Sequence, residues 1–169
     1  MADCSKLVPF ILKWEGGFVC DPVDRGGATN KGVTLSTFKQ VFGSDKTVED
    51  LKQMTDNQFN LVLKRFYWDR WHGDKINNQS IANIVVDWVW ASGKWGIIKV
   101  QELLGLQKDG IVGNLTLQKI NNYPDKKELF DKIQEARRVF IGNIILLHPE
   151  QKKFEKGWLN RINDLKFTE

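Results

Sequence analysis

Cysteine and histidine are scarce in this chain of 169 residues, and the few that occur are far apart. Cys4 and Cys20 are too few for a disulfide framework, and no histidine or cysteine accompanies them at the spacing of a metal site. We expect both thiols to be buried or idle, because a free cysteine behaves as a small hydrophobic residue. A Cys4–Cys20 bridge stays an alternative. His72 and His148 also lack close companions, so the sequence indicates neither a metal centre nor a nucleophilic triad.

Long apolar runs and phosphate-binding motifs are missing as well. The longest apolar candidate, Phe140 to Leu147, is interrupted by Gly142 and Asn143 and falls short of the roughly 20 residues that a membrane span needs. The N-terminus has no long apolar core followed by a small-residue cleavage site, so we expect no secretory signal. The glycine-containing loops lack the spacing that cradles phosphates. We therefore predict no integral membrane segment and no cofactor.

Charge of neither sign dominates the chain. The 25 basic residues are offset by 21 acidic ones, which gives a net charge of +4 and a pI near 9.0. Such a balance provides mild attraction to an anionic partner, and because the two signs are interspersed it does not support nucleic-acid binding. With 41% hydrophobic residues and no linker or low-complexity tract, the chain can bury a sizeable core in one compact body.

Apolar residues recur at helical spacing almost throughout the chain. The first helix is indicated by Leu7, Phe10, Ile11 and Trp14, with Pro9 in its first turn and Asp3 or Ser5 as its cap. Gly16 and Gly17 are expected to end it by entering left-handed backbone conformations. Later helices are indicated by a capping box over 55–58, by an apolar face over 81–89 that stops at Ser92-Gly93, and by Asp125 with Glu128 before a stripe over 129–147. Pro149 is expected to start the last helix, whereas 21–33 reads as a loop or short irregular hairpin.

Two carboxylates near the N-terminus stand in different surroundings. Glu15 ends the apolar helical run within Trp14-Glu15-Gly16-Gly17-Phe18, and Asp24 lies in the polar, glycine-rich stretch that follows. Glycosidases need one carboxyl held protonated to give a proton to the leaving oxygen, and usually a second held ionised to activate water or to attack. Glu15 and Asp24 fit these two environments. The alternatives are a solvated Glu15 and an Asp24 that bonds the backbone of a turn.

The stretch over 14–34 resembles the N-terminal signature of glycoside hydrolase family 108, lysozyme-like N-acetylmuramidases that cut bacterial peptidoglycan. Phe18 and Val33 stand where members often have Tyr and Ile. Segments 66–71 and 87–93 look like the family's middle blocks, with Ala91 where Asn is expected, and segments 100–105, 109–116 and 154–161 resemble the peptidoglycan-binding region that usually follows. The resemblance covers nearly the whole chain. It implies an all-α, lysozyme-like fold, with a catalytic region over 1–94 and a helical peptidoglycan-binding region over 95–169 packed on it as one body.

The resemblance also implies roles for individual residues. Glu15 becomes the general acid, and Asp24 the base or electrostatic stabiliser. Thr29, Asn30 and Thr34 are expected to position water or sugar hydroxyls, although Thr34 is equally placed to cap a helix from Leu35 to Phe42. Aromatic rings stack on the apolar faces of sugars, and the candidates for this are Tyr67, Trp68, Trp71 and Trp90, whereas Trp14 and Trp88 are expected in the core. Asp87 is either a buried partner that orients the site or an acceptor within its own helix.

The activity that this resemblance implies is hydrolysis of the β-1,4 linkage between N-acetylmuramic acid and N-acetylglucosamine by an endolysin- or autolysin-type muramidase. One alternative is a lytic transglycosylase, in which the muramic 6-hydroxyl attacks internally. Another is a non-catalytic wall-binding or secretion-associated module that uses the Asp109-Gly110 region, although an intact Glu15 argues against it. The expected partner is bacterial peptidoglycan, and the enzyme is expected to be a monomer. We expect synthesis in the cytoplasm and action at the cell wall or periplasm after holin-like or other release.

Overall fold

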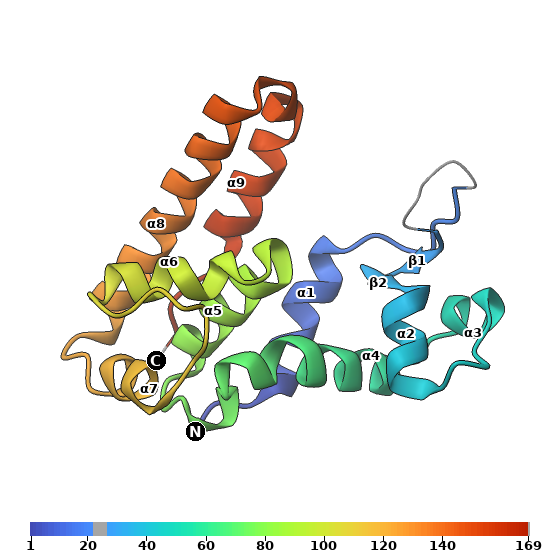
Figure 1. Cartoon of the computed structure of the whole chain (residues 1–169), viewed down its shortest axis with the longest axis horizontal. Coiled ribbons are helices and arrows are strands. Elements are labelled where there is room, and N and C mark those ends of the chain that lie inside the picture. Colours follow the sequence, from blue (N-terminus) through green and yellow to red (C-terminus); the bar gives the residue numbers. More distant parts are fainter. Residues whose placement is uncertain (22–26, 169) are drawn as a thin grey trace. The chain divides into compact units, whose positions relative to one another are not determined.

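The structure, a computed structural model, describes residues 1–21 and 27–168. They form two compact units, one of Cys4–Asp69 and the other of Met1–Asp3 together with Arg70–Glu169. As predicted, the fold is mainly helical, with one short antiparallel hairpin near the N-terminus (Figure 1). Among the described residues, no helix is both long enough and apolar enough to cross a membrane.

The unit Cys4–Asp69 holds the hairpin and four α-helices. In chain order its elements are η1 (Cys4–Lys6), α1 (Val8–Trp14), β1 (Thr29–Asn30), β2 (Val33–Thr34), α2 (Leu35–Phe42), α3 (Val48–Lys52), α4 (Asp56–Leu63) and the π-helical turn η2 (Lys64–Trp68). Its fully buried side chains include Leu7, Ile11, Phe38, Leu51, Phe59, Val62 and Leu63. Each helix contributes to this list, so the core of the unit is assembled from the apolar faces that the sequence displays.

Of the helix starts predicted for this unit, the structure confirms one cap and contradicts another. Pro9 lies in the first turn of α1 as predicted, but neither Asp3 nor Ser5 is the cap. Leu7 takes the N-cap position without a side-chain hydrogen bond, because the 3-10 turn η1 directly precedes it. The predicted capping box is confirmed at α4, where Thr55 and Gln58 each bond the other's backbone N–H.

The hairpin turns over two residues. Thr29 pairs with Thr34 and Asn30 with Val33, which leaves Lys31 and Gly32 as the turn. Their φ angles are 50° and 77°, and a two-residue turn with positive φ at both positions is the one whose twist suits antiparallel strands. Glycine at position 32 adopts this conformation without steric cost. The polar segment read as a loop or short hairpin is therefore a hairpin from residue 29 onward.

The unit Arg70–Glu169 contains the longer helices. Its elements are η4 (Gly73–Lys75), α5 (Gln79–Ser92), α6 (Trp95–Leu103), α7 (Asn114–Asn121), α8 (Lys126–Leu147), η5 (Pro149–Phe154) and α9 (Glu155–Asp164), while η3 (Asp69–Trp71) begins at the last residue of the other unit. Helix α5 ends before Gly93, and Asp125 caps α8 by accepting a hydrogen bond from the Glu128 N–H, both as predicted. Pro149 begins the 3-10 turn η5, and the last helix, α9, begins only at Glu155. The predicted start of the last helix at Pro149 is therefore wrong.

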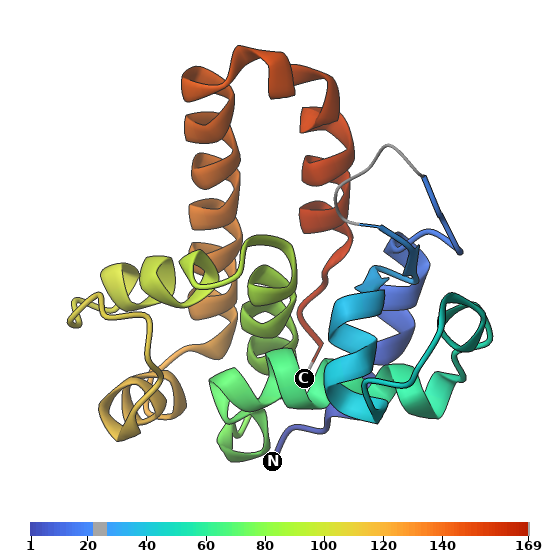
Figure 2. The ribbon, with the colours of Figure 1, turned by 45° about the vertical axis from the view of Figure 1, so that its right-hand side comes forward.

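Helices α8 and α9 run side by side in opposite directions, joined by η5 (Figure 1, Figure 2). Helix α8 packs on α5 and α6. The α5 and α6 backbones approach closely at Gly96, where an added Cβ would lie 2.7 Å from the Val89 nitrogen. Helices from 95–169 thus share a core with α5, which comes from the part of the chain before residue 94.

A buried glutamine organises the loop before α7. The Gln101 amide donates to Asp109 Oδ1 and to the Ile111 carbonyl, each at 2.9 Å, and its oxygen accepts from the Gly110 N–H. Gly110 has φ 70°, as a tight loop with glycine predicts. The Ile111 N–H and the Gln101 amide hold the pKa of Asp109 below its usual value by bonding its carboxylate. These polar groups are therefore engaged in shaping the loop.

Both cysteines carry free thiols, Cys4 buried and Cys20 exposed. The bridge left open by the sequence does not form.

Candidate active site

Glu15 directly follows helix α1. Its backbone N–H donates to the Ile11 carbonyl at 3.0 Å, and its own φ and ψ of −90° and 143° are extended, so the helix ends here. The side chain is half-buried. Neither Gly16 nor Gly17 has a positive φ. The prediction that these glycines end the helix through left-handed conformations is wrong, because the chain has already become extended at Glu15.

The two glycines instead leave room beside the acid. Both are exposed, and among the described residues a Cβ added to either would meet no atom within 4 Å. Packing against the described residues does not require glycine at these positions. Their small size allows a bulky ligand to approach the backbone next to the Glu15 carboxyl.

A β-bridge ties the segment after Glu15 to the hairpin. The backbones of Val19 and Thr29 exchange two N–H to carbonyl hydrogen bonds, each 2.8 Å long. Val19 lies four residue steps after Glu15, and an extended chain of that length spans at most about 14 Å. The bridge thereby ties Thr29 to the segment that begins at the acid.

The hairpin register brings two predicted site residues together, because Thr29 and Thr34 are directly opposed. Opposed residues project from the same face of a two-stranded sheet. The Thr34 hydroxyl accepts a hydrogen bond from the Thr37 N–H at 3.1 Å and caps α2, so the capping alternative is confirmed. Thr29 is half-buried at the paired position.

Asn30 lies on the opposite side of the hairpin and is buried, 5% exposed. Its amide donates to the carbonyls of Leu51 at 2.9 Å and Lys52 at 3.2 Å, at the end of α3. The Leu51 carbonyl also accepts from the Met54 N–H at 3.1 Å, so the Asn30 amide adds a second bond to a carbonyl at the end of this helix. The amide predicted to contact sugar hydroxyls instead joins the hairpin to α3.

Asp24, the second predicted catalytic residue, lies outside the described residues. Asp21, which precedes that gap, is exposed.

The predicted aromatic platforms differ in exposure. Trp68 and Trp71 are fully buried, so neither ring has an exposed face on which a sugar could stack. Their large apolar surface explains this burial. Tyr67 and Trp90 are half-buried, Tyr67 in the π-helical turn of the unit with Glu15 and Trp90 in α5 of the other unit. Trp88 lies in the core as predicted, whereas Trp14 is half-buried.

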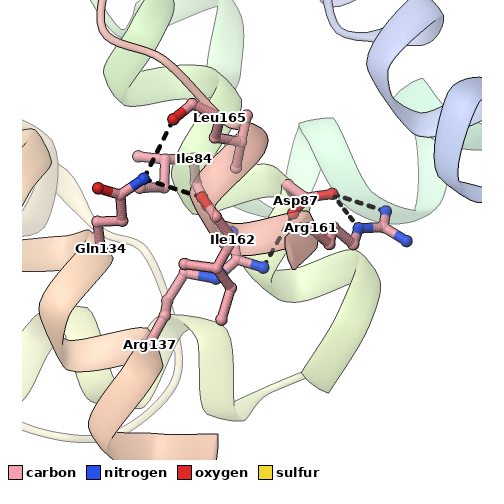
Figure 3. Close-up of polar contacts among 7 residues, drawn as sticks. All are labelled: Ile84, Asp87, Gln134, Arg137, Arg161, Ile162 and Leu165. Atoms are coloured by element: carbon pink, nitrogen blue, oxygen red, sulfur yellow. Dashed lines mark hydrogen bonds and ion pairs between the residues drawn. The ribbon is translucent and has the colours of Figure 1, made fainter. Parts of the chain in front are cut away.

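Asp87 is the centre of a buried ion cluster (Figure 3). Its Oδ2 accepts from Arg137 Nη2 of α8 at 2.9 Å, and its Oδ1 accepts from Arg161 Nη2 of α9 at 2.7 Å. Asp87 is fully buried and the Arg137 side chain is 3% exposed. Burial lowers the pKa of Arg137, and the charge of Asp87 opposes that shift. Asp87 is thus a buried partner, as the first of the two expectations has it, and not an acceptor within its own helix, because both of its oxygens bind arginines from two other helices. Its part in orienting the site stays a prediction.

Sequence reasoning missed these two arginines and Trp95. A signal for the cluster was present, since Asp87 lies on the apolar face of α5 and Arg137 lies between Ile133 and Phe140 on the apolar stripe of α8. A charge on such a face needs a partner of opposite sign when it is buried. Trp95 follows a Gly93-Lys94 break and lies outside the helical stripes from which the other rings were selected.

Comparison with known proteins divides the chain between residues 93 and 96, whereas the compact units divide it after Asp69. The glycosyl hydrolase 108 family matches residues 8–93, and a predicted peptidoglycan domain matches residues 96–163. No curated protein matches the chain. The solved structure of Brucella abortus SagA is 25% identical, with a TM-score of 0.78 over 96% of this chain and 90% of that one.

These matches define the class of the protein as a glycoside hydrolase with a peptidoglycan-binding domain. The chain belongs to the glycosyl hydrolase 108 family.

Proposed function

We propose that the chain is an N-acetylmuramidase that hydrolyses the β-1,4 linkage between N-acetylmuramic acid and N-acetylglucosamine, with Glu15 as its general acid. The observation that carries the proposal is the position of Glu15, a half-buried carboxyl at the end of α1 beside two glycines that leave open space. The glycosyl hydrolase 108 match spans this residue, and the peptidoglycan domain follows it in the chain.

In the proposed reaction Glu15 donates its proton to the glycosidic oxygen while the bond from that oxygen to C1 of the muramic acid breaks. The oxygen leaves as the 4-hydroxyl of the N-acetylglucosamine. A water molecule adds its oxygen to C1 and gives a proton to a base, for which Asp24 is the proposed residue. General acid catalysis of this kind typically contributes about a hundred- to ten-thousand-fold to the rate.

Thr29 is the proposed holder of the attacking water. Of the two opposed threonines, Thr34 uses its hydroxyl to cap α2 and to bond the Thr37 hydroxyl at 3.1 Å. The bridge to Val19, which ties Thr29 to the segment after the acid, supports this role. Tyr67 and Trp90 are the aromatic residues that we retain as sugar contacts, because both have exposed surface.

The experiment that tests this function is digestion of purified peptidoglycan followed by mass spectrometry of the new ends. The expected products carry muramic acid reducing ends. Anhydro-muramic ends would make the enzyme a lytic transglycosylase, and an absence of products would make the chain a binding module. Glu15→Gln should remove most of the activity while wall binding persists, because glutamine keeps the shape and cannot donate the proton.

Two further variants complete the test. Glu49→Gln changes an exposed acid of the same unit and should retain full activity. Asp24→Asn should lower activity less than Glu15→Gln, because Thr29 or bound water can share its role. Equal and near-complete losses in Asp24→Asn and Glu15→Gln would make Asp24 indispensable. Full activity in a folded Glu15→Gln protein would overturn the assignment of the acid.

The proposed substrate sets the place of action. Peptidoglycan lies outside the cytoplasm, so we propose that the enzyme works at the cell wall or in the periplasm, after holin-like or other release from the cytoplasm. Fractionation of producing cells before and after lysis, followed by immunoblotting, tests this proposal.

A further inference from the structure

The unit Arg70–Glu169 contains an open groove of about 790 Å³. Its walls come from the end of α5, the start of α6 and the second half of α8, including Ser92, Trp95, Phe140, Asn143 and Leu147. Small-molecule sites typically occupy about 300–1,000 Å³. The groove is therefore large enough for a ligand, and none of its lining residues belongs to the unit that carries Glu15.

A column of three aromatic rings supports one side of the groove. Trp88 is buried in α5 and meets the edge of Phe140 at a centroid distance of 5.8 Å. Phe140 in turn contacts Trp95, with centroids 6.5 Å apart and ring planes inclined by 41°. The indole of Trp95 thus contacts the half-buried Phe140, which packs on the buried Trp88, and Trp95 itself remains 52% exposed.

Exposed apolar side chains continue along the groove. Leu146 and Leu147 at the end of α8 are 80% and 77% exposed. An exposed patch of large apolar residues marks an interaction site more often than scattered single residues do. The buried residues of α8 end at Arg137, so Leu146 and Leu147 lie beyond the part of the helix that the described residues enclose.

The groove also offers a few polar groups. Ser92 contributes a hydroxyl, Asn143 an amide, and Lys99 an ammonium that pairs with Glu102 at 3.0 Å. A sugar ring has an apolar C–H face that suits an indole, and hydroxyl and acetamido groups that need donors and acceptors at its edge. An aromatic platform with a small polar rim suits an N-acetylated sugar better than it suits an acyl chain, which has no polar edge.

We propose that this groove binds the β-1,4-linked, N-acetylated glycan strand of peptidoglycan, with a sugar ring stacked on Trp95. The proposal rests on peptidoglycan being the substrate, and it assigns the wall contact to specific residues. The match to the predicted peptidoglycan domain begins at residue 96, directly after Trp95. The Asp109-Gly110 loop is the weaker candidate, because Gln101 and the loop backbone engage its polar groups.

The test measures binding of the full chain in a Glu15→Gln background, so that turnover does not remove the ligand. Pelleting with insoluble peptidoglycan and titration with soluble N-acetylglucosamine oligomers are compared for Trp95→Ala, Trp95→Phe and Phe154→Ala. Phe154 is the matched control, an aromatic residue 46% exposed that stacks on Trp158 outside the groove. Thermal unfolding of each variant confirms that the fold persists.

Trp95→Ala is expected to weaken both forms of binding by about three- to tenfold, the size typical of one aromatic contact. Trp95→Phe should keep part of the affinity, and Phe154→Ala all of it. Unchanged binding by Trp95→Ala overturns the proposal. Two other effects of Trp95→Ala would also overturn the proposal. If the parent protein is a dimer in light scattering and Trp95→Ala is a monomer, the groove binds a second copy. If the parent binds phosphatidylglycerol vesicles and Trp95→Ala does not, the groove binds a lipid surface.

These outcomes are separable from those of the proposed function. If Glu15 proves dispensable for cleavage while Trp95→Ala still loses binding, the groove stands and the catalytic assignment fails. If Glu15→Gln abolishes cleavage while Trp95→Ala binds normally, the catalytic assignment stands and the groove proposal fails.

Discussion

Arg137 and Asp87 form a buried ion pair, with Arg137 Nη2 2.9 Å from Asp87 Oδ2 and both side chains almost completely enclosed. The two residues are fifty positions apart and belong to different family matches, Asp87 to the glycosyl hydrolase domain and Arg137 to the peptidoglycan domain. The pair therefore couples the stability of one matched segment to the presence of the other.

Asp87→Asn is predicted to be strongly destabilising. Asparagine keeps the shape but leaves the buried Arg137 guanidinium without a counter-charge, and removing one member of a buried pair typically costs about 3–5 kcal/mol. Urea unfolding followed by circular dichroism measures the change. Glu135→Gln, which removes the exposed partner of Arg138, is the control and should change the free energy of unfolding by less than about 1 kcal/mol. Equal effects of the two variants would show that the buried pair contributes no more than a surface pair.

A fragment that ends at residue 94 is predicted to be poorly soluble or unfolded. It would lack Arg137 and Arg161 and would expose the faces of α5 that pack on α6 and α8. Expression of residues 1–94, with solubility and thermal unfolding as readouts, tests this expectation. Cooperative unfolding together with full muramidase activity would mean that the catalytic region is separable after all.

Valine substitutions at the two opposed threonines should have different effects. Thr34→Val removes the cap of α2 and should lower the free energy of unfolding by about 0.5–2 kcal/mol. Thr29→Val should lower the turnover number on peptidoglycan with little change in stability, because valine retains the β-branched shape and loses only the hydroxyl proposed to hold water. Parallel urea titrations and turbidity assays compare them. A Thr29→Val enzyme with normal turnover would remove Thr29 from the mechanism.

Gly16→Ala is predicted to separate stability from activity. An added methyl meets no described atom and the backbone has no positive φ, so the variant should be as stable as the parent or up to about 1 kcal/mol more stable. If the glycan passes over this backbone, the same methyl should raise KM for peptidoglycan. Steady-state kinetics on solubilised glycan strands decides the matter, and an unchanged KM would mean that the ligand stays away from Gly16.

Helix ends that depend on capping side chains or on a glycine could be predicted from the sequence. The capping box at Thr55, the cap at Asp125 and the break at Gly93 all mark real helix ends, because each depends on side chains a few residues apart. The end of α1 was predicted for the wrong reason, and η1 and η5 were not foreseen. Short 3-10 turns depend on how the chain enters a neighbouring helix, which periodicity does not encode.

The candidate site was less predictable than the fold. Glu15 was selected from its local context together with the family resemblance, and its role stays a prediction. The roles of Asn30 and Asp87 depend on α3, α8 and α9, which are distant in sequence. The burial of Trp68 and Trp71 also depends on tertiary packing. Spacing along one helix cannot distinguish a ring that faces a groove from one that faces the core.

Helix α8 is 22 residues long, yet its buried side chains, Leu129, Phe130, Ile133 and Arg137, all lie between Lys126 and Arg137. Amide hydrogens in a helix exchange with solvent through local openings, whose cost rises with the apolar contacts that an opening breaks. Protection should therefore be high from Leu129 to Arg137 and fall steadily toward Leu147. The wall of the groove formed by Asn143 and Leu147 belongs to the part that is expected to open most readily, so its hydrogen exchange should respond to a bound glycan while that of the Asp87 cluster stays unchanged.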